Sequence, residues 1–410
     1  MTNIQQVTAL DNTYSNTKKL TGKVSGQIAK DLDRWGYMLW QNDMDDSIWN
    51  FDTRWSDSDN ATLRMIARDA GYGENRLLSA LEDATLAIAA QNRRHPVREY
   101  LELSAWDGRD HIASLSAHFT DRHDPIVYAD GSKKTVFQAF LTRWLVGSIA
   151  KVFGDTNAAR SNFVLVLATG QNAGKSHFAK WLCPLAGFFD EKRVDPDNKD
   201  HSLARAKTWV WEIGELGATT RRADVEALKL HITATTVTER KPYGHHDTVK
   251  NSIASYLGTV NLDGSGFLHD TTGNRRFAVV ELESINWAYD GKIDVGQVWA
   301  QAMWLWRQDP RAYRFTTEEE TVQNANAEEH LEADIIADMI VRLFEVDPKR
   351  SEWRITSSEL LDALRTMGSL SRGNDRVQGR EIAKSLKKMG ITSKRSNLSL
   401  IHISEPTRPY

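Results

Sequence analysis

The residues best able to do chemistry lie in one stretch, "TGQNAGKSH". Its Gly-Lys-Ser core offers a backbone that can turn sharply, an amine that can reach phosphate oxygens and a hydroxyl that can bind Mg²⁺. We therefore predict a phosphate-binding loop formed by Thr169, Gly170, Gln171, Asn172, Ala173, Gly174, Lys175, Ser176 and His177. In the strict spacing of such loops the first position is glycine, which here is Thr169, with Gly170 beside it. The alternative is a chance Gly-Lys-Ser on a surface turn.

Hydrolysis of a nucleoside triphosphate also needs a carboxylate beside Mg²⁺ and a group that orients the attacking water. The stretch "TWVWEIGEL" offers Glu212 at the end of an apolar run and Glu215 three residues later. We assign Glu212, with Ser176, to the metal and Glu215 to the water, although the spacing also permits the reverse. The competing interpretation is two exposed glutamates after a core strand.

Two further polar groups follow apolar runs. "IASYLGTVN" ends in Asn261, which is placed to sense the γ-phosphate or hold the water. "DTTGNRRF" puts Arg275 and Arg276 on a turn before another apolar run. Guanidinium groups suit the charge that develops in phosphoryl transfer, and one of the two arginines could act on a neighbouring subunit. An ordinary basic turn is the alternative.

These residues require an α/β sheet to position them. Short apolar runs between 161 and about 310 alternate with helical segments, which predicts such a sheet with helices packed on it. We predict a P-loop NTPase core with a helical N-terminal domain and a C-terminal winged-helix-like domain. The expected division is a flexible leader (1–28), a helical domain (29–134), the ATPase domain (135–315), an acidic linker (316–334), a truncated winged-helix-like domain (335–397) and a final segment (398–410).

The final segment has a separate origin in our interpretation. "LSLIHISEPTR" is the literal translation of the end of a transposase-type sequencing adapter, so we exclude residues 398–410 from the fold and expect a different natural C-terminus.

Composition limits the function classes. The chain has 410 residues, 26% of them charged, and a formal net charge of -3, which excludes a uniformly basic nucleic-acid coat but allows local basic patches. A single cysteine, Cys183, excludes an intrachain disulfide. No signal peptide or long apolar run is present, so we expect a cytoplasmic protein that does not enter a membrane.

Several motifs in order resemble one family. "TGQNAGKSHF", "WVWEIGEL", "TERKPYG", "LGTVN" and "LHDTTGNRRF" are similar to motifs of the virulence-associated protein E family, phage and mobile-element proteins related to superfamily 3 helicases. The resemblance extends upstream to "HPVREYLELSAWDGRDHI" and covers about residues 95–310.

The resemblance implies ATP and Mg²⁺ as cofactors and a bacterial host cell as the setting. It matches Lys175 and Ser176 to the nucleotide and Mg²⁺ positions, Glu212 and Glu215 to the acidic motif, Asn261 to the sensor, and Arg275 and Arg276 to the arginine motif. Such relatives form homo-oligomeric rings, often hexamers, that move single-stranded DNA. Members often carry a primase domain, and no segment here has the length for one, so a primase is a candidate partner.

Two basic segments are candidates for the DNA contact. "RKPYGHHDTVK" combines charge with an aromatic ring, and we propose Arg240, Lys241, Tyr243 and His245 as pore-facing. The family usually has Arg where this chain has His245, which predicts a weaker contact. Residues 372–397 carry eight basic and two acidic residues, including Lys387 and Lys388, which suits a phosphate-contacting face or a solvated helix.

The leading hypothesis is an ATP-dependent DNA translocase or helicase that acts in replication of a phage or mobile element. A DNA-binding or scaffold protein with a degenerate nucleotide site is the alternative, suggested by Thr169 and His245. A small-molecule kinase is third, because it shares the loop but leaves "TGNRRF" unexplained.

Overall fold

The computed structural model describes residues 23–73, 77–192, 194–195, 198–214, 216, 222–239, 248–262, 274–330, 340, 343–344, 355–366, 382–383, 385–386, 393–394 and 400–401. No helix in these ranges is long and apolar enough to cross a lipid bilayer.

The N-terminal part combines helices with a small sheet around its own apolar core. Its elements are α1 (Lys23–Arg34), β1 (Leu39–Asn42), β2 (Ile48–Asn50), β3 (Thr53–Arg54), α2 (Asp57–Asp69), α3 (Leu77–Gln91) and β4 (Arg93–Arg94). The strands pair in the order β3-β2-β1-β4. Buried Ile28, Leu32, Leu63 and Leu81 join the helices to this sheet. The expected helical domain therefore also contains strands, and helix α1 already begins within the expected leader.

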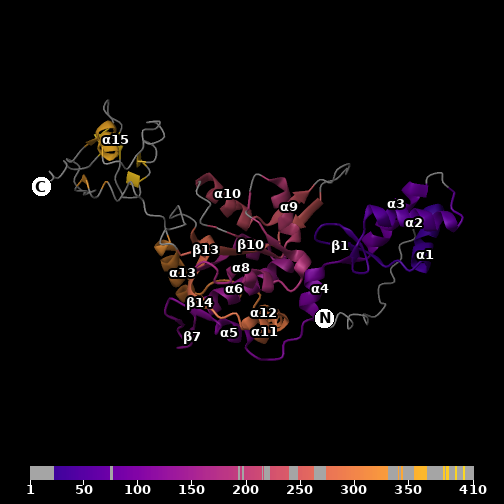
Figure 1. Ribbon diagram of the computed structural model, residues 1–410, viewed down its shortest axis with the longest axis horizontal. Coiled ribbons are helices and arrows are strands. Elements are labelled where there is room, and N and C mark those ends of the chain that lie inside the picture. The colour runs from indigo at the N-terminus through magenta and orange to yellow at the C-terminus, as the bar shows by residue number, and fades with distance from the viewer. Residues whose placement is uncertain are drawn as a thin grey trace.

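A six-stranded sheet forms the centre of the molecule (Figure 1). Its strands are β5 (Phe119–Asp121), β8 (Val164–Thr169), β9 (Phe189–Glu191), β10 (Val210–Ile213), β13 (Ser255–Asn261) and β14 (Phe277–Ile285). The order is β5-β14-β8-β13-β10-β9, and all neighbours are parallel except β5 and β14. Strands β8, β10, β13 and β14 confirm the α/β sheet that the apolar runs between 161 and about 310 predict. The carboxyl ends of β8, β13 and β10 lie side by side, which is where polar residues were expected to meet.

Helices cover both faces of the sheet, as the continuous apolar character of its strands requires. One face packs on α6 (Val136–Val152), α8 (Lys175–Trp181) and α12 (Val295–Gln308). The other packs on α9 (Lys199–Lys207), α10 (Arg222–Thr233) and α13 (Thr317–Glu329). Figure 1 shows α9 and α10 on the side opposite α12. Thr135 caps α6 by accepting a hydrogen bond from the backbone N–H of Gln138.

Shorter elements complete the described chain. They are α4 (Pro96–Leu103), α5 (His111–Ser116), β6 (Ile126–Val127), β7 (Lys133–Lys134), α7 (Thr156–Arg160), η1 (Ala186–Phe188), β11 (Thr236–Glu239), β12 (Thr248–Asn251), η3 (Asn274–Arg276), α11 (Tyr289–Lys292), β15 (Ile355–Thr356), α15 (Ser357–Thr366), β16 (Ser393–Lys394) and β17 (Leu400–Ile401). A capping box precedes α15, because Thr356 and Glu359 exchange hydrogen bonds. Strand β17 falls within the segment that we attribute to an adapter.

Helix α13 occupies the stretch that the sequence predicted as an acidic linker. Glu319 is 1% exposed, and its carboxylate accepts hydrogen bonds from the Arg143 guanidinium at 2.8 and 3.1 Å and from the Tyr128 hydroxyl at 2.7 Å. Asn326 donates to the backbone oxygen of Val279 on β14. These contacts make α13 part of the central domain, which corrects the expectation.

Candidate active site

The predicted phosphate loop joins β8 to α8 through a sharply turned backbone. Asn172 and Gly174 have φ angles of 60° and 97°, the left-handed region that favours glycine. Thr169, by contrast, is the last residue of β8, is 1% exposed and pairs with Asn261 of β13. Its backbone is an ordinary strand, so the fold does not need glycine there. The departure from the strict loop spacing therefore does not strain the backbone at Thr169.

Lys175 lies at the start of α8 with its amine turned into the loop. Nζ donates hydrogen bonds to the backbone oxygens of Thr169 at 3.2 Å and Gly170 at 2.8 Å, and to Oδ1 of Asn261 at 3.0 Å. All three acceptors are neutral, and burial lowers the pKa of the amine. The ammonium form thus lacks a counter-charge among the described residues, which prepares the position for an anion.

Ser176 and Glu212 meet as the sequence predicted. The Ser176 hydroxyl donates to Oε1 of Glu212 at 2.5 Å, although the residues come from α8 and β10. Glu212 is fully buried, and among the described residues no group meets the geometry of a hydrogen bond to its Oε2. Burial raises the pKa of the carboxyl, the Ser176 hydroxyl lowers it, the Glu191 carboxylate raises it further, and the nearby Thr259 side chain lowers it. A buried carboxylate oxygen without a partner, beside a hydroxyl, fits an Mg²⁺ ligand set.

Glu191 is an acidic neighbour that sequence reasoning missed. It ends the edge strand β9 and pairs in register with Glu212, so both side chains lie on the face that carries α8. It is exposed, and its charge reaches Glu212 strongly enough to affect that pKa. The signal in the sequence is the run "GFFDE", a short apolar segment that ends in carboxylates like "WVWEI".

Strand β13 places Asn261 between the loop and the acidic strand. Because β13 lies between β8 and β10, the amide of Asn261 is next to Lys175 and on the same sheet edge as Glu212. Four predicted residues thus converge: Lys175, Ser176, Glu212 and Asn261. Glu215 lies outside the described residues, so its assignment to the water stays a prediction.

Arg275 and Arg276 lie at the opposite edge of the sheet. They occupy η3 just before β14, whose first residue, Phe277, pairs with Val164 at the start of β8. The loop follows the other end of β8, five residues on, or about 16 Å away at the rise of a strand. Arg275 is exposed, and Nε of Arg276 is buried with no hydrogen-bond partner among the residues that the structure describes. Neither joins the site of its own chain.

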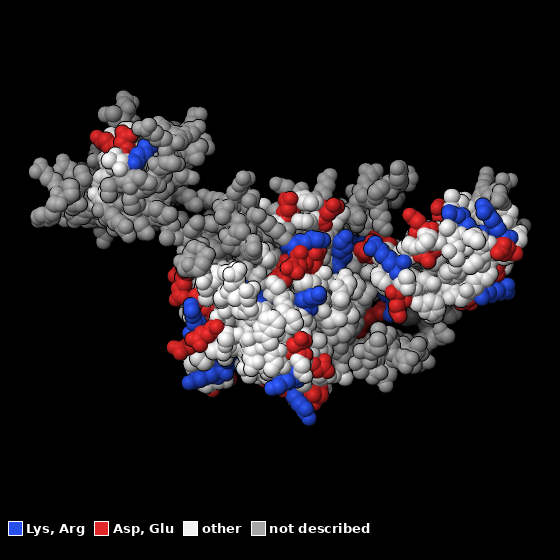
Figure 2. All heavy atoms as spheres, viewed as in Figure 1, with Lys and Arg blue, Asp and Glu red and all other residues white. Residues whose placement is uncertain are grey.

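The predicted DNA-contacting residues Arg240, Lys241, Tyr243, His245, Lys387 and Lys388 lie outside the described residues. The first four connect β11 to β12, which pair as an antiparallel hairpin from Thr236 with Asn251 to Glu239 with Thr248. Lys250 of β12 donates to the Asp46 carboxylate at 2.6 Å, so the base of the hairpin is fixed to the N-terminal part. On the face in Figure 2, charged side chains of both signs among the described residues are interspersed.

A residue outside every predicted motif contacts the loop at Ala173 and His177. Trp287, between β14 and α11, donates from Nε1 to the backbone oxygen of Ala173 at 3.1 Å. Its ring stacks on the His177 ring with centroids 5.0 Å apart. Nδ1 of His177 hydrogen-bonds the Tyr289 hydroxyl at 3.1 Å.

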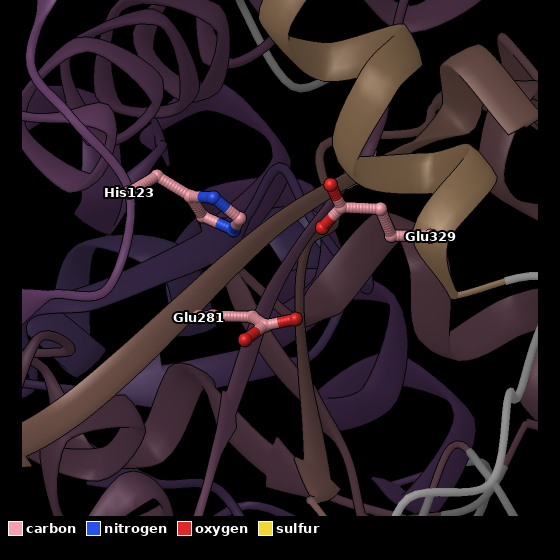
Figure 3. Close-up of side chains that lie close together, drawn as sticks. All are labelled: His123, Glu281 and Glu329. Carbon is pink, nitrogen blue, oxygen red and sulfur yellow. The ribbon is translucent and has the colours of Figure 1, made fainter.

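A second cluster of possible metal ligands lies on the opposite face of the sheet from Glu212. His123, Glu281 and Glu329 point toward one another, with ligand atoms within 4.8 Å (Figure 3). The Glu281 carboxylate already pairs with Arg122 at 3.2 Å and with His330 at 3.2 Å. Because the Arg122 guanidinium balances this carboxylate and the His330 ring contacts it, we interpret the cluster as a polar network that fixes the end of α13 to β14.

Comparisons with known proteins agree with these motifs. The virulence-associated protein E-like domain matches residues 101–332. Among curated proteins none matches. A solved structure described as the A form apo structure of the NrS-1 C-terminal region shares 12% identity with a TM-score of 0.49, covering 93% of this chain and 100% of that one. A full-length MCM homolog from Methanopyrus kandleri shares 13% identity with a TM-score of 0.31, covering 72% and 57%. By its domain match, the chain belongs to the virulence-associated protein E-like family.

Proposed function

We propose that the chain is an ATP-dependent DNA translocase or helicase that acts in replication of a phage or mobile element. One observation carries the proposal: within the described part of the chain, the Ser176 hydroxyl touches a fully buried Glu212 whose second oxygen has no hydrogen-bond partner, beside a lysine without a counter-charge. In the empty protein, a buried carboxylate oxygen without a partner and a lysine without a counter-charge cost free energy. A bound Mg²⁺–triphosphate would supply the missing partner for each. ATP hydrolysis measured with and without single-stranded DNA tests it, and stimulation by DNA is expected.

Each residue has a distinct task in this proposal. The loop backbone amides bind the β- and γ-phosphates, and Lys175 exchanges its carbonyl contacts for phosphate oxygens. Ser176 and Glu212 hold Mg²⁺, which neutralises the charge that develops on the phosphates. Asn261 holds the γ-phosphate or the water, and Glu215 orients that water for attack. The Glu191 carboxylate is a further negative charge beside Glu212, whose pKa it raises.

The position of the arginines supports a ring. Arg275 is exposed at the sheet edge remote from the loop, so it can reach a nucleotide only if a second copy presents its loop there. A head-to-tail interface of that kind generates a closed ring when its rotation closes, and an open filament when it does not. We therefore propose a homo-oligomer, with a hexamer as the family expectation, in which Arg275, and Arg276 beside it, act on the adjacent subunit.

Mixing two inactive variants tests this arrangement. Lys175→Ala and Arg275→Ala should each hydrolyse ATP slowly. In a mixed ring, an intact loop of an Arg275→Ala subunit can face an intact arginine of a Lys175→Ala subunit, at about a quarter of the interfaces in an equal mixture. We expect mixing to restore about that share of wild-type hydrolysis. Activity that stays at the level of the separate variants, in rings shown by mass to be mixed, would contradict action between subunits.

The proposed partner is single-stranded DNA, held at the ring centre by the loop between β11 and β12. Arg240, Lys241, Tyr243 and His245 are proposed to contact it, because a basic loop with an aromatic ring can bind phosphates and stack a base. Lys387 and Lys388 are a second proposed contact. A primase stays a proposed partner, and the cytoplasm of a bacterial host stays the proposed compartment.

A DNA-binding or scaffold protein with a degenerate nucleotide site is the competing function, and Thr169 tests it. If Thr169 had impaired an ancestral loop, Thr169→Gly should raise ATP affinity. We expect no gain, because Thr169 is an ordinary strand residue, and a loss of about 1 kcal/mol in the free energy of unfolding, because glycine weakens a strand. Calorimetric ATP binding and urea unfolding measure both, and a clear gain in affinity would favour the degenerate site.

A further inference from the structure

Trp287 is an exposed aromatic residue held against the phosphate loop. Its side chain is 51% exposed, although burying a tryptophan would stabilise the fold. The hydrogen bond from Nε1 to the oxygen of Ala173 fixes the edge of the ring to the loop. The ring therefore has a set position beside the loop and a large surface open to solvent.

Gly174 shows how closely the ring approaches. A Cβ atom at this position would lie 2.6 Å from Cε2 and Cζ2 of Trp287, and the φ of 97° is itself unfavourable for other residues. The glycine of the Gly-Lys-Ser core thus also makes room for Trp287. Trp287 therefore packs against the loop as part of its structure, although it lies 113 residues further along the chain than Gly174.

His177 extends this aromatic surface. Its ring lies 5.0 Å from the Trp287 ring at an interplanar angle of 20°, and Tyr289 and Asp290 hold its two nitrogens at 3.1 and 3.5 Å. His177 directly follows Ser176 in the first turn of α8, so the paired rings lie where the loop enters the helix. A nucleoside whose phosphates are bound in the loop contacts these rings if it leaves the loop on this side.

We propose that Trp287 and His177 form a stacking platform for the base of the bound nucleotide. The inference rests on the proposed function, because it assigns a role within the same site. Stacking uses the flat face that every base has, so the platform should accept all four bases, with purines preferred for their larger area. The platform would thus add affinity for a nucleoside triphosphate without strict selection of ATP.

The competing explanation is that Trp287 only supports the loop through Ala173 and Gly174. Inorganic tripolyphosphate separates the two, because it has the phosphates of ATP but no base. Loss of a platform weakens binding of ATP alone, whereas loss of loop support weakens both ligands.

The test measures the affinity of wild type and of Trp287→Ala and Trp287→Phe for Mg²⁺–ATP and Mg²⁺–tripolyphosphate by calorimetry. Trp304→Ala is the matched control, since Trp304 is 41% exposed on α12 and contacts Trp106 instead of the loop. We expect Trp287→Ala to weaken ATP by about 5- to 150-fold and tripolyphosphate by less than about 2-fold. Trp287→Phe should lose less, and the control should bind ATP as wild type does.

Two results would contradict the stacking platform but leave the proposed function standing. These are an equal loss of affinity for both ligands in Trp287→Ala, or an unchanged affinity for ATP in this variant. If wild type bound neither ligand, the proposed function would fall and the platform with it. Thermal unfolding of each variant shows that the comparison is made on folded protein.

Discussion

Lys175→Ala is expected to reduce ATP hydrolysis by at least about 100-fold, because it removes the lysine whose positive charge is placed to contact the triphosphate. The variant should stay folded. Lys175 is buried among three neutral acceptors, and burial already lowers its pKa, so its loss removes a desolvated charge. Initial rates of phosphate release and the melting temperature measure the two effects.

Lys180→Ala is the matched control, since Lys180 belongs to the same helix but is exposed. It should hydrolyse ATP within about 2-fold of wild type, as surface substitutions usually have small effects. Equal rates in wild type and Lys175→Ala would remove the assignment of hydrolysis to this loop.

Glu212→Gln is expected to abolish hydrolysis and to stabilise the protein in the absence of Mg²⁺. Glutamine keeps the acceptor for Ser176 but lacks the charge that binds the metal, so we expect a loss of at least about 100-fold in rate. The stabilisation follows from burial, because a neutral amide costs less to bury than a carboxylate with an unpaired oxygen. We expect a gain on the order of 1 kcal/mol in the free energy of unfolding.

The pH dependence of the free energy of unfolding tests whether the buried charge of Glu212 causes this difference in stability. The folded pKa of Glu212 is raised above its unfolded value, so the folded protein binds this proton more tightly. The carboxyl therefore destabilises the fold at neutral pH, and this cost disappears as pH falls through the raised pKa toward the ordinary value of 4.5. The difference in stability between Glu212→Gln and wild type should shrink over that range. A constant difference would contradict the role of the buried charge.

Glu191→Gln provides the comparison for a neighbouring charge. Glu191 is exposed and raises the pKa of Glu212. Its replacement should lower the pKa of Glu212 and leave most of the hydrolysis intact, since Glu191 makes no contact with Ser176 among the described residues.

The strands of the central sheet and the residues that meet in the candidate active site could be predicted from the sequence for the same reason. Apolar runs such as "FVLVLA" and "TWVWEI" are buried on both faces, as strands of a parallel sheet are, and parallel strands bring their carboxyl ends together. This rule alone predicts that Ser176, Glu212 and Asn261 meet. It also explains why the backbone accommodates Thr169 in place of glycine, because strand β8 continues through this residue.

Other features of the fold and of the site could not be predicted from the spacing of apolar residues in the sequence. Helix α13 buries Glu319, Gln323 and Asn326, which contact Arg143 and backbone oxygens. Its buried face is therefore as polar as an exposed helix face, and the sequence pattern does not reveal that it is buried. The short strands of the N-terminal sheet carry too few residues for a pattern. Trp287 reaches the loop from far along the chain, and only the three-dimensional structure shows that contact.

The most direct test of the account is the rate of ATP hydrolysis by wild type as Mg²⁺ is titrated, beside Glu212→Gln under the same conditions. The account predicts hydrolysis that rises and saturates with Mg²⁺ in wild type and stays near background in the variant. Wild-type protein that releases no phosphate at any Mg²⁺ concentration, or a variant that matches it, would contradict the claim that Ser176 and Glu212 hold the metal for catalysis.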